Sequence, residues 1–411
     1  PCATLLLAAT CAQAQLLDFK SGHVKGQYLL GTYPDDSLLR ELIGTPSHDF
    51  NGDLRLLVDG RKNSWSWQAD YQFIVRSGDT VNIGRQLPDN GLLPGGNLED
   101  DRRLMDLTHV ISETDDRVIL HRLDRLHLGY AGDKAVARIG RQAVSWGNGL
   151  IYNPVDFFNP FDPAAVDKEY KTGDDMFYGQ YLQDSGNDWQ FVSVQRRDED
   201  DNVSTDVSST ALKFHGFGLQ WEYDLLLAEH YDEFMLGAGG LLNVGESVVR
   251  SDITLTDGKE EWVTSLVLNW SYSWVWGGHN VSAVAEYFYN GFGLRESDYT
   301  ADKIREETDL VDRIVRGELF TLGRHYVAGS LLLELTPLLN ITPNLFVNLG
   351  DSSALLQLVM QWDLAQNWQL LGALSAPLGS SGTEYGGLET GVDDLTLEVG
   401  PSLFAQIAWY F

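Results

Sequence analysis

Apolar and polar side chains alternate along much of this chain. In residues 262–274 the two faces carry Trp262, Leu266, Leu268, Trp270, Tyr272 and Trp274 against Ser265, Asn269, Ser271 and Ser273. Residues 64–76, 219–230, 281–290 and 353–364 repeat the pattern. A period of two over about ten residues is typical of a strand with lipid on one face and a polar interior on the other. The pattern therefore predicts strands that span a membrane.

Counting such segments predicts an all-β fold, a single transmembrane antiparallel β-barrel of about 18 strands, with 16 as the alternative. The expected strands are 24–33, 49–60, 64–76, 117–131, 134–142, 174–183, 187–197, 206–215, 219–231, 233–243, 245–256, 261–275, 279–290, 322–336, 340–350, 353–364, 367–377 and 397–411. An even number keeps both termini in the periplasm.

Four connections are long: 77–116, 143–173, 291–321 and 378–396. Bacterial barrels carry long loops outside the cell and short turns in the periplasm, so these are expected to be extracellular, and any of them is able to fold inward. A short helix is expected within 291–321. A second short helix, at 37–43, is expected on the periplasmic side.

The C-terminal residues alternate up to the end of the chain, with Leu403, Ala405, Ile407, Trp409 and Phe411 on one face. An aromatic last residue preceded by apolar residues at every second position resembles the signal that the barrel assembly machinery reads. This resemblance implies an outer-membrane location, with that machinery, membrane lipid and lipopolysaccharide as partners.

The N-terminus has the pattern of an export signal. Residues 5–9 form a short apolar run, and Ala12-Gln13-Ala14 matches a cleavage signal. We expect residues 1–14 to be a signal peptide, apparently truncated, and 15–411 to be one barrel domain. Lipidation at Cys11 is the alternative. No later segment offers the roughly 20 continuous apolar residues that a membrane helix needs.

Composition excludes several functions. The chain has 29 Lys and Arg against 59 Asp and Glu, and this excess of negative charge argues against nucleic acid as a partner. Its two cysteines, Cys2 and Cys11, both lie in the leader, so the exported chain has no cysteine chemistry. Neither a nucleophile elbow nor a zinc-binding spacing is present. We expect no catalytic residues, no metal and no cofactor.

One segment departs from the strand pattern. It runs Arg138-Ile-Gly140-Arg141-Gln142, reaches Trp146-Gly147-Asn148-Gly149, and continues through Asn153-Pro154, Asn159-Pro160 and Asp162-Pro163. Each of these prolines disfavours helix and strand continuation. The segment must therefore lie in the lumen, at the rim or across an opening.

This motif resembles a segment of porin-like outer-membrane proteins related to the alginate-export type. The resemblance implies passage of a solute across the outer membrane, although the acidic excess argues against a polyanionic solute. We predict a channel for small polar solutes, narrowed around residues 138–175. Its expected lining is Arg122, Arg125, Arg138, Arg141, Gln142, Trp146, Asn153, Asp156, Asn159 and Asp162.

Two interpretations of these charges remain open. Basic residues of the strands 117–131 and 134–142 and acidic residues of 156–175 form either opposed rows that orient solutes or ion pairs that pin an inward loop. A plugged barrel that serves as a surface receptor or as the outer-membrane partner of an export system is the alternative function. A membrane-embedded hydrolase is less favoured.

Overall fold

The computed structural model describes residues 18–411 except 87–99, 296, 298 and 392–394. Within these residues the chain forms nineteen antiparallel strands and four short helices. The strands are β1 (Asp18–Gly31), β2 (Ser47–Lys62), β3 (Trp65–Gly78), β4 (Thr108–Thr114), β5 (Arg117–Ala131), β6 (Ala135–Gln142), β7 (Asp174–Leu182), β8 (Asp188–Arg197), β9 (Val203–Phe217), β10 (Trp221–His230), β11 (Glu233–Val244), β12 (Ser247–Asp257), β13 (Trp262–Trp276), β14 (His279–Tyr289), β15 (His325–Thr336), β16 (Leu339–Asn348), β17 (Ser353–Ala365), β18 (Trp368–Leu378) and β19 (Ser402–Tyr410). The helices are α1 (Leu38–Ile43), α2 (Asp79–Gln86), α3 (Ala301–Glu306) and α4 (Thr308–Val315).

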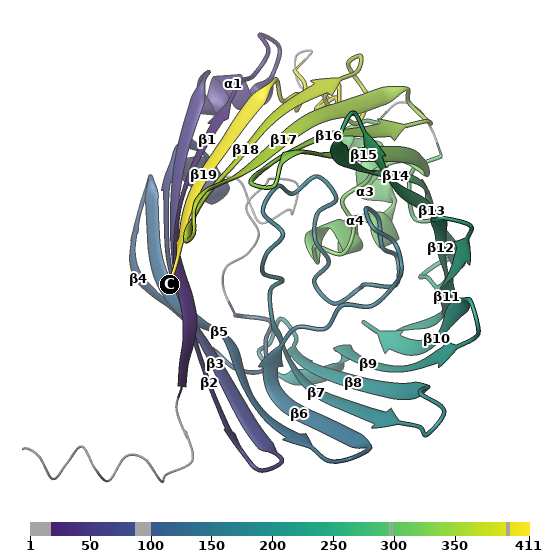
Figure 1. Ribbon diagram of the computed structural model, residues 1–411. Helices are drawn as coiled ribbons and strands as arrows, with labels where there is room; N and C mark the ends of the chain where they lie inside the picture. The colour runs from purple at the N-terminus through teal and green to yellow at the C-terminus, as the bar shows by residue number, and fades with distance from the viewer. Residues whose placement is uncertain (1–17, 87–99, 296, 298, 392–394) are drawn as a thin grey trace, which may run out of the picture.

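Eighteen of the strands close into one barrel, as the alternation predicts (Figure 1). The ring closes where β1 pairs with β19, from His23 opposite Tyr410 to Gly31 opposite Ser402. The backbones of Gly22 and Phe411 extend this seam with hydrogen bonds of 2.8 and 2.9 Å. Closure leaves no open sheet edge at the seam, and a barrel needs this because lipid offers no hydrogen-bond partners.

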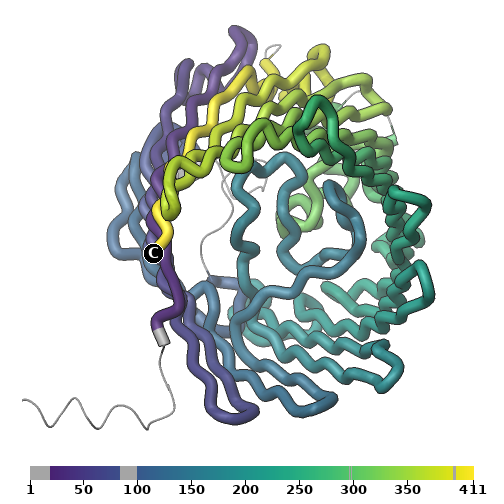
Figure 2. The backbone as a smooth tube through the Cα atoms, in the orientation of Figure 1, coloured from purple at the N-terminus to yellow at the C-terminus, as the bar shows by residue number. Residues whose placement is uncertain are grey.

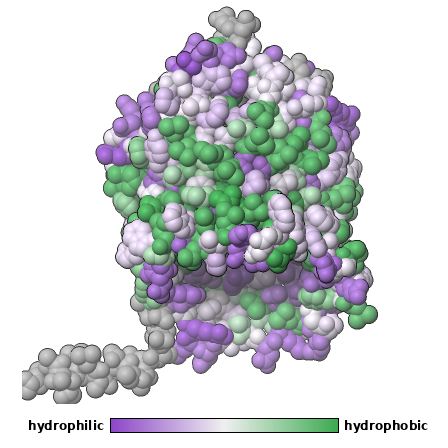
Figure 3. All heavy atoms as spheres, turned by 45° about the horizontal axis from the view of Figure 1, so that its top comes forward, coloured by the Kyte–Doolittle hydropathy of each residue, from purple (hydrophilic) through white to green (hydrophobic). Residues whose placement is uncertain are grey.

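The alternating faces point as the sequence indicates. In β13 the side chain of Trp270 is 41% exposed on the outer surface, whereas Asn269 beside it is 2% exposed and faces the interior. The C-terminal strand follows the same rule, because Ile407 and Trp409 face out while Gln406 and Ala408 are buried. Figure 3 shows the result, with apolar side chains gathered over the barrel wall and hydrophilic ones toward its ends. This exterior fits a lipid bilayer.

Loops at the two ends of the barrel differ in length. The end that carries both termini has only short turns, such as Gly277–Gly278 between β13 and β14. The opposite end carries the long connections, including 32–46, which holds α1. In bacterial barrels the short turns are periplasmic. The expectation of a periplasmic helix at 37–43 is therefore wrong. The helix exists, but it lies in the connection between β1 and β2, which is at the end of the barrel opposite the termini, with the long loops.

All eighteen expected strands correspond to barrel strands, with ends that differ by a few residues. The nineteenth, β4, lies in the 77–116 connection, where no strand was expected. It is only seven residues long, and it pairs with Arg117–Arg122 of β5. β6 pairs with β5 only over Leu126–Ala131. Because β6 ends early, it leaves an edge of β5 free, and β4 occupies that edge.

Among the residues that the structure describes, the connections 143–173 and 290–324 both fold into the barrel. Figure 2 shows residues 143–173, the blue segment, inside the ring of strands, and Figure 1 shows α3 and α4 within the same outline. We call residues 143–173 the inner loop. In the part of the chain that the structure describes, no helix is long and apolar enough to cross a membrane. The signal peptide expected at 1–14 lies outside the described residues.

Candidate functional site

The inner loop leaves the wall because its sequence cannot continue the sheet. β6 ends at Gln142, and Gly147 follows with φ of 90°, a conformation that favours glycine. Pro154, Pro160 and Pro163 then lack the backbone N–H groups that a sheet ladder requires. The segment therefore crosses the interior as an irregular chain held by side chains.

A small apolar core stabilises the loop inside the barrel. Trp146, Phe157 and Phe158 are buried, and the Trp146 ring packs edge-on to both phenylalanine rings at centroid distances of 6.4 and 5.6 Å. The indole N–H donates to Oε1 of Gln190 on β8 at 2.8 Å. Asn153 donates to the carbonyl oxygen of Trp146 at 2.7 Å. These contacts fold the loop onto itself and onto the wall.

Two carboxylates on β12 and β14 accept hydrogen bonds from backbone N–H groups of the loop. Asp252 of β12 accepts from the N–H groups of Asn148 at 2.5 Å and Gly149 at 3.1 Å. Glu286 of β14 accepts from the N–H of Leu150 at 2.9 Å and from those of the next two residues. Backbone N–H groups that are buried without a partner cost about 1–3 kcal/mol each. The two acids therefore hold the tip of the loop against β12 and β14.

The returning half of the loop is attached to another part of the wall, at β1 and β17. Lys25 of β1 forms ion pairs with Asp167 at 2.7 Å and Glu169 at 2.6 Å. Gln357 of β17 donates to the carbonyl oxygen of Ala164 at 2.9 Å. With the contacts to β12 and β14, these attachments stretch the loop across the barrel from wall to wall.

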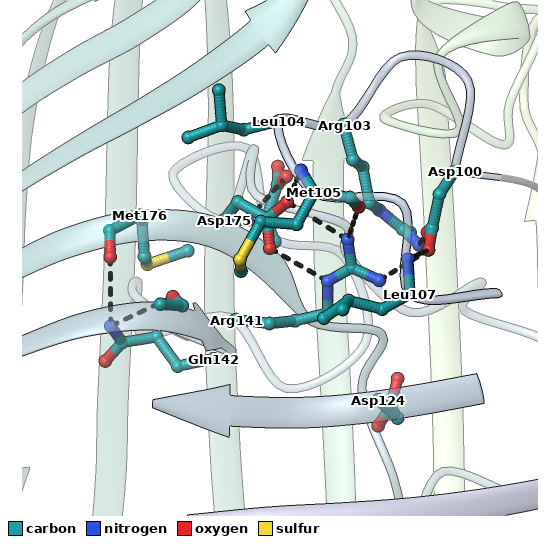
Figure 4. A network of polar contacts seen from close by, with 12 residues as sticks. Asp100, Arg103, Leu104, Met105, Leu107, Asp124, Arg141, Gln142, Asp175 and Met176 are labelled. Carbon is teal, nitrogen blue, oxygen red and sulfur yellow. Dashed lines mark hydrogen bonds and ion pairs between the residues drawn. The ribbon is translucent and has the colours of Figure 1, made fainter. Parts of the chain in front are cut away.

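Arg141 lies at the centre of a buried network beside β6 (Figure 4). Its guanidinium donates to Asp175 of β7 at 2.9 and 3.0 Å, to Asp100 at 2.7 Å and to the carbonyl oxygen of Met105. Burial raises the pKa of Asp100, but Arg141 and Arg103 outweigh burial and lower it. The network ties residues 100–107 to the wall beside the short strand β6.

A β-bulge determines on which face of β5 the charged side chains lie. Strict alternation puts Arg122 and Arg125 on opposite faces, but the pairing of β3 with β5 shifts register at Asp124. Both arginines therefore reach the interior: Arg122 donates to Gln72 at 2.8 Å, and Arg125 pairs with Asp124 at 2.6 Å. His121 lies on the other face, against Tyr71 and His109.

The remaining expected lining residues are scattered. Arg138 lies on the interior face with its guanidinium 4.4 Å from the centre of the Tyr178 ring. Gln142 is buried and donates to the Met176 carbonyl oxygen at 3.2 Å. Asp156 pairs with Lys171 at 2.5 Å, within the loop. Burial raises the pKa of Asp156, and the Lys171 ammonium opposes that shift.

The last two expected positions lie in the loop backbone turns. Asn159 has φ of 51°, a left-handed conformation that asparagine tolerates. Asp162 accepts from the N–H of Ala164 at 2.8 Å. Asp167 and Glu169 of the loop pair with Lys25 and Asp156 pairs with Lys171, so none of these three acids pairs with Arg122 or Arg125.

The second inward segment, residues 290–324, is also attached through charges. Arg313 of α4 pairs with Glu233 of β11. Glu318 pairs with His230 of β10 at 2.8 Å and with Arg316 at 3.1 Å. Burial raises the pKa of Glu318, but His230 and Arg316 outweigh it and lower the pKa to about 2.

Three wall residues that hold the inner loop were not predicted from the sequence. Lys25, Asp252 and Glu286 were not among the expected site residues, although each is a charged residue on the polar face of a membrane strand. A charge at mid-strand in a barrel faces the interior and needs a partner there. That signal marks them as interior residues, but the identity of the partner depends on how the loop folds.

Among the described residues, no group of three or more His, Cys, Asp or Glu side chains is arranged to hold a metal ion.

Comparisons with known proteins bear on the fold alone. No family model matches the sequence, and no curated protein matches it. The structure is similar to that of Acinetobacter baumannii OccAB4, with 9% identity, a TM-score of 0.54, and coverage of 97% of this chain and 99% of the other. It is also similar to Acinetobacter baumannii OccAB3, with 11% identity, a TM-score of 0.52 and coverage of 95% and 98%.

A third similar structure is Pseudomonas aeruginosa OccK5 (OpdH), with 7% identity, a TM-score of 0.51, and coverage of 95% of this chain and 97% of the other. Each match extends over almost the full length of both chains. The chain therefore has the 18-stranded barrel fold of the Occ and Opd outer-membrane porins.

Proposed function

We propose that this chain is an outer-membrane channel that passes small polar solutes through a lumen narrowed by the inner loop. Proteins of the Occ and Opd type, whose fold it shares, are outer-membrane channels for small solutes. The observation that carries the proposal is the attachment of the inner loop to both walls, at Glu286 on one side and Lys25 on the other. A fixed internal loop narrows a barrel without adding a separate plug domain.

The polar interior supports a channel rather than a lipid-embedded enzyme. Acidic and basic side chains lie next to one another on the interior wall, for example His23 beside Asp53 and Arg55 beside Asp70, while the outer surface is apolar. Expected interactions with lipopolysaccharide and with the barrel assembly machinery are part of this proposal. The relationship to the alginate-export type, suggested by the Gly140-Arg141-Gln142 motif, also stays a proposal.

Single-channel recording in planar bilayers tests the proposal. The purified chain is expected to give discrete conductance steps in salt solution. A barrel without steps, under conditions where a known porin conducts, would show that the inner loop seals the lumen. That outcome favours the alternative of a surface receptor or an export partner.

A further inference from the structure

A cavity of about 200 Å³ lies behind the inner loop, between residues 149–168, the interior face of β10–β14 and residues 313–321. Its volume exceeds the roughly 150 Å³ of an engineered protein cavity that admits benzene. The site is therefore large enough for a six-membered ring. It lies apart from the arginines of β5 and β6.

The apolar part of the lining consists of rings. Phe157 and Phe161 come from the inner loop, Phe288 from β14, and Phe292 from the segment after it. Tyr152 lines the same space and stacks on Phe288 at a centroid distance of 4.8 Å. Aromatic rings accept flat apolar faces. This side of the cavity therefore suits a ring with exposed C–H groups.

The charged groups of the lining are already occupied. Asp156 pairs with Lys171, Arg313 with Glu233, and Glu318 with His230. A charged solute would have to break one of these buried pairs or leave its own charge without a partner, and both are costly.

Lys168 is the exception in the described lining. It is exposed, and its ammonium donates to the Pro163 carbonyl oxygen at 2.8 Å. Because every other charged group of the lining is already paired, the cavity favours an uncharged molecule.

Two lining side chains have hydroxyl groups without a hydrogen-bond partner. They belong to Tyr152 and Thr256, which are 3% and 1% exposed. Thr254, Ser265 and Thr321 add further hydroxyl groups to the lining. A buried polar group without a partner is unfavourable, so a molecule that supplies hydroxyl groups next to these side chains is favoured.

We propose that this cavity binds a small uncharged polyhydroxylated ring, that is, a monosaccharide. The inference rests on the proposed channel function, because the monosaccharide would be the solute that binds behind the inner loop on its way through the channel. The rings of the lining pack on the C–H face of the sugar, and the hydroxyl groups of Tyr152 and Thr256 exchange hydrogen bonds with its edge.

Calorimetric titration of the detergent-purified full chain tests the inference, with glucose as the probe and glucuronate and glucosamine as charged analogues. Glucose is expected to bind, and each analogue to bind more weakly. Equal or tighter binding of glucuronate would overturn the inference in favour of an anion site at Lys168. The absence of glucose binding would overturn it in favour of a cavity filled with water.

Two isosteric variants locate the site. Tyr152→Phe and Thr256→Val each remove a hydroxyl group that has no partner in the protein, so the fold is retained. Each is expected to weaken glucose binding about five- to tenfold, the effect of one hydrogen bond. Tyr272→Phe is the matched control, because its hydroxyl group donates to Glu246 on an exposed surface. Unchanged affinity in both cavity variants would overturn the location.

Bilayer recordings separate this inference from the proposed function. A chain that conducts ions but does not bind glucose is a channel without this site. A chain that binds glucose but never conducts has the site, and the channel proposal fails.

Discussion

Arg141 and Asp175 lie opposite each other on β6 and β7 and form two hydrogen bonds of 2.9 and 3.0 Å. Both side chains are almost fully buried, and Asp100 contacts the same guanidinium. The pair therefore joins two short wall strands to a distant segment of the chain. Arg138, three residues earlier on the same strand, instead stacks its guanidinium on the Tyr178 ring.

Replacing Arg141 by alanine is expected to destabilise the barrel by about 3–5 kcal/mol, because Asp175 loses its buried ion-pair partner and Asp100 keeps only Arg103. Urea unfolding followed by tryptophan fluorescence measures the change. Arg102→Ala is the control, since its pair with Glu199 is exposed and worth about 1 kcal/mol or less. Equal stability of the two variants would contradict the role of the network.

Replacing Arg138 by alanine is expected to shift ion selectivity toward cations, because it removes a positive charge from the interior face. Reversal potentials in a salt gradient measure the shift. Arg138→Lys keeps the charge and is expected to leave the potential unchanged. An unchanged potential in the alanine variant would mean that Arg138 lies outside the ion path.

Replacing Glu286 by alanine is expected to loosen the inner loop, because three backbone N–H groups at 150–152 lose their acceptor. Single-channel conductance should rise and fluctuate more. Glu334→Ala is the matched control, since that carboxylate is exposed at a barrel end and accepts from Asn280. If the conductance stayed the same, the loop would be held by its other attachments.

Glu384 provides a pH-dependent contact between the 379–401 loop and the wall. It accepts from Asn348 at 2.8 Å, from the Leu322 N–H at 3.1 Å and from the Tyr326 hydroxyl group. Burial raises the pKa of Glu384 from 4.5 to about 7, and Asp351 adds to the rise. The protonated form is thus the one that the folded loop favours.

The sign of the pH effect follows from that raised pKa. The contribution of Glu384 to loop attachment is complete below pH 4.5 and is lost as pH rises through about 7. Hydrogen exchange of residues 379–391 should therefore accelerate between pH 6 and 8. Glu384→Gln imitates the protonated form and should remove that acceleration beyond the intrinsic rate. An equal pH dependence in both proteins would contradict the assignment.

Phe411 is expected to matter for assembly. Its ring lies 4.7 Å from that of Trp409 and 6.0 Å from that of Phe19, and its backbone closes the seam with Gly22. Phe411→Ser should lower the amount of folded barrel in the outer membrane, as judged by heat-modifiable mobility on gels. Phe320→Ser, on an exposed loop phenylalanine, is the control. Normal levels of the Phe411 variant would rule out the proposed signal.

Local pattern was sufficient for the eighteen barrel strands and, where no bulge intervenes, for their faces. Alternation places Trp270 outward and Asn269 inward because successive side chains of a strand point to opposite faces, whatever the rest of the chain does. The same rule located all eighteen barrel strands. It also identified the inner loop, because its glycines and prolines exclude a regular strand in any context.

Partners inside the barrel were decided by tertiary structure. Alternation separates Arg122 from Arg125, and only the bulge at Asp124, formed against β3, brings both inward. Leu150 meets Glu286 across 136 residues of sequence, and Lys25 meets Asp167 across 142. Such pairs depend on closure of the ring and on the path of the loop through it. The two-residue alternation of a strand determines which face a side chain occupies, but closure of the barrel determines which residues lie opposite it.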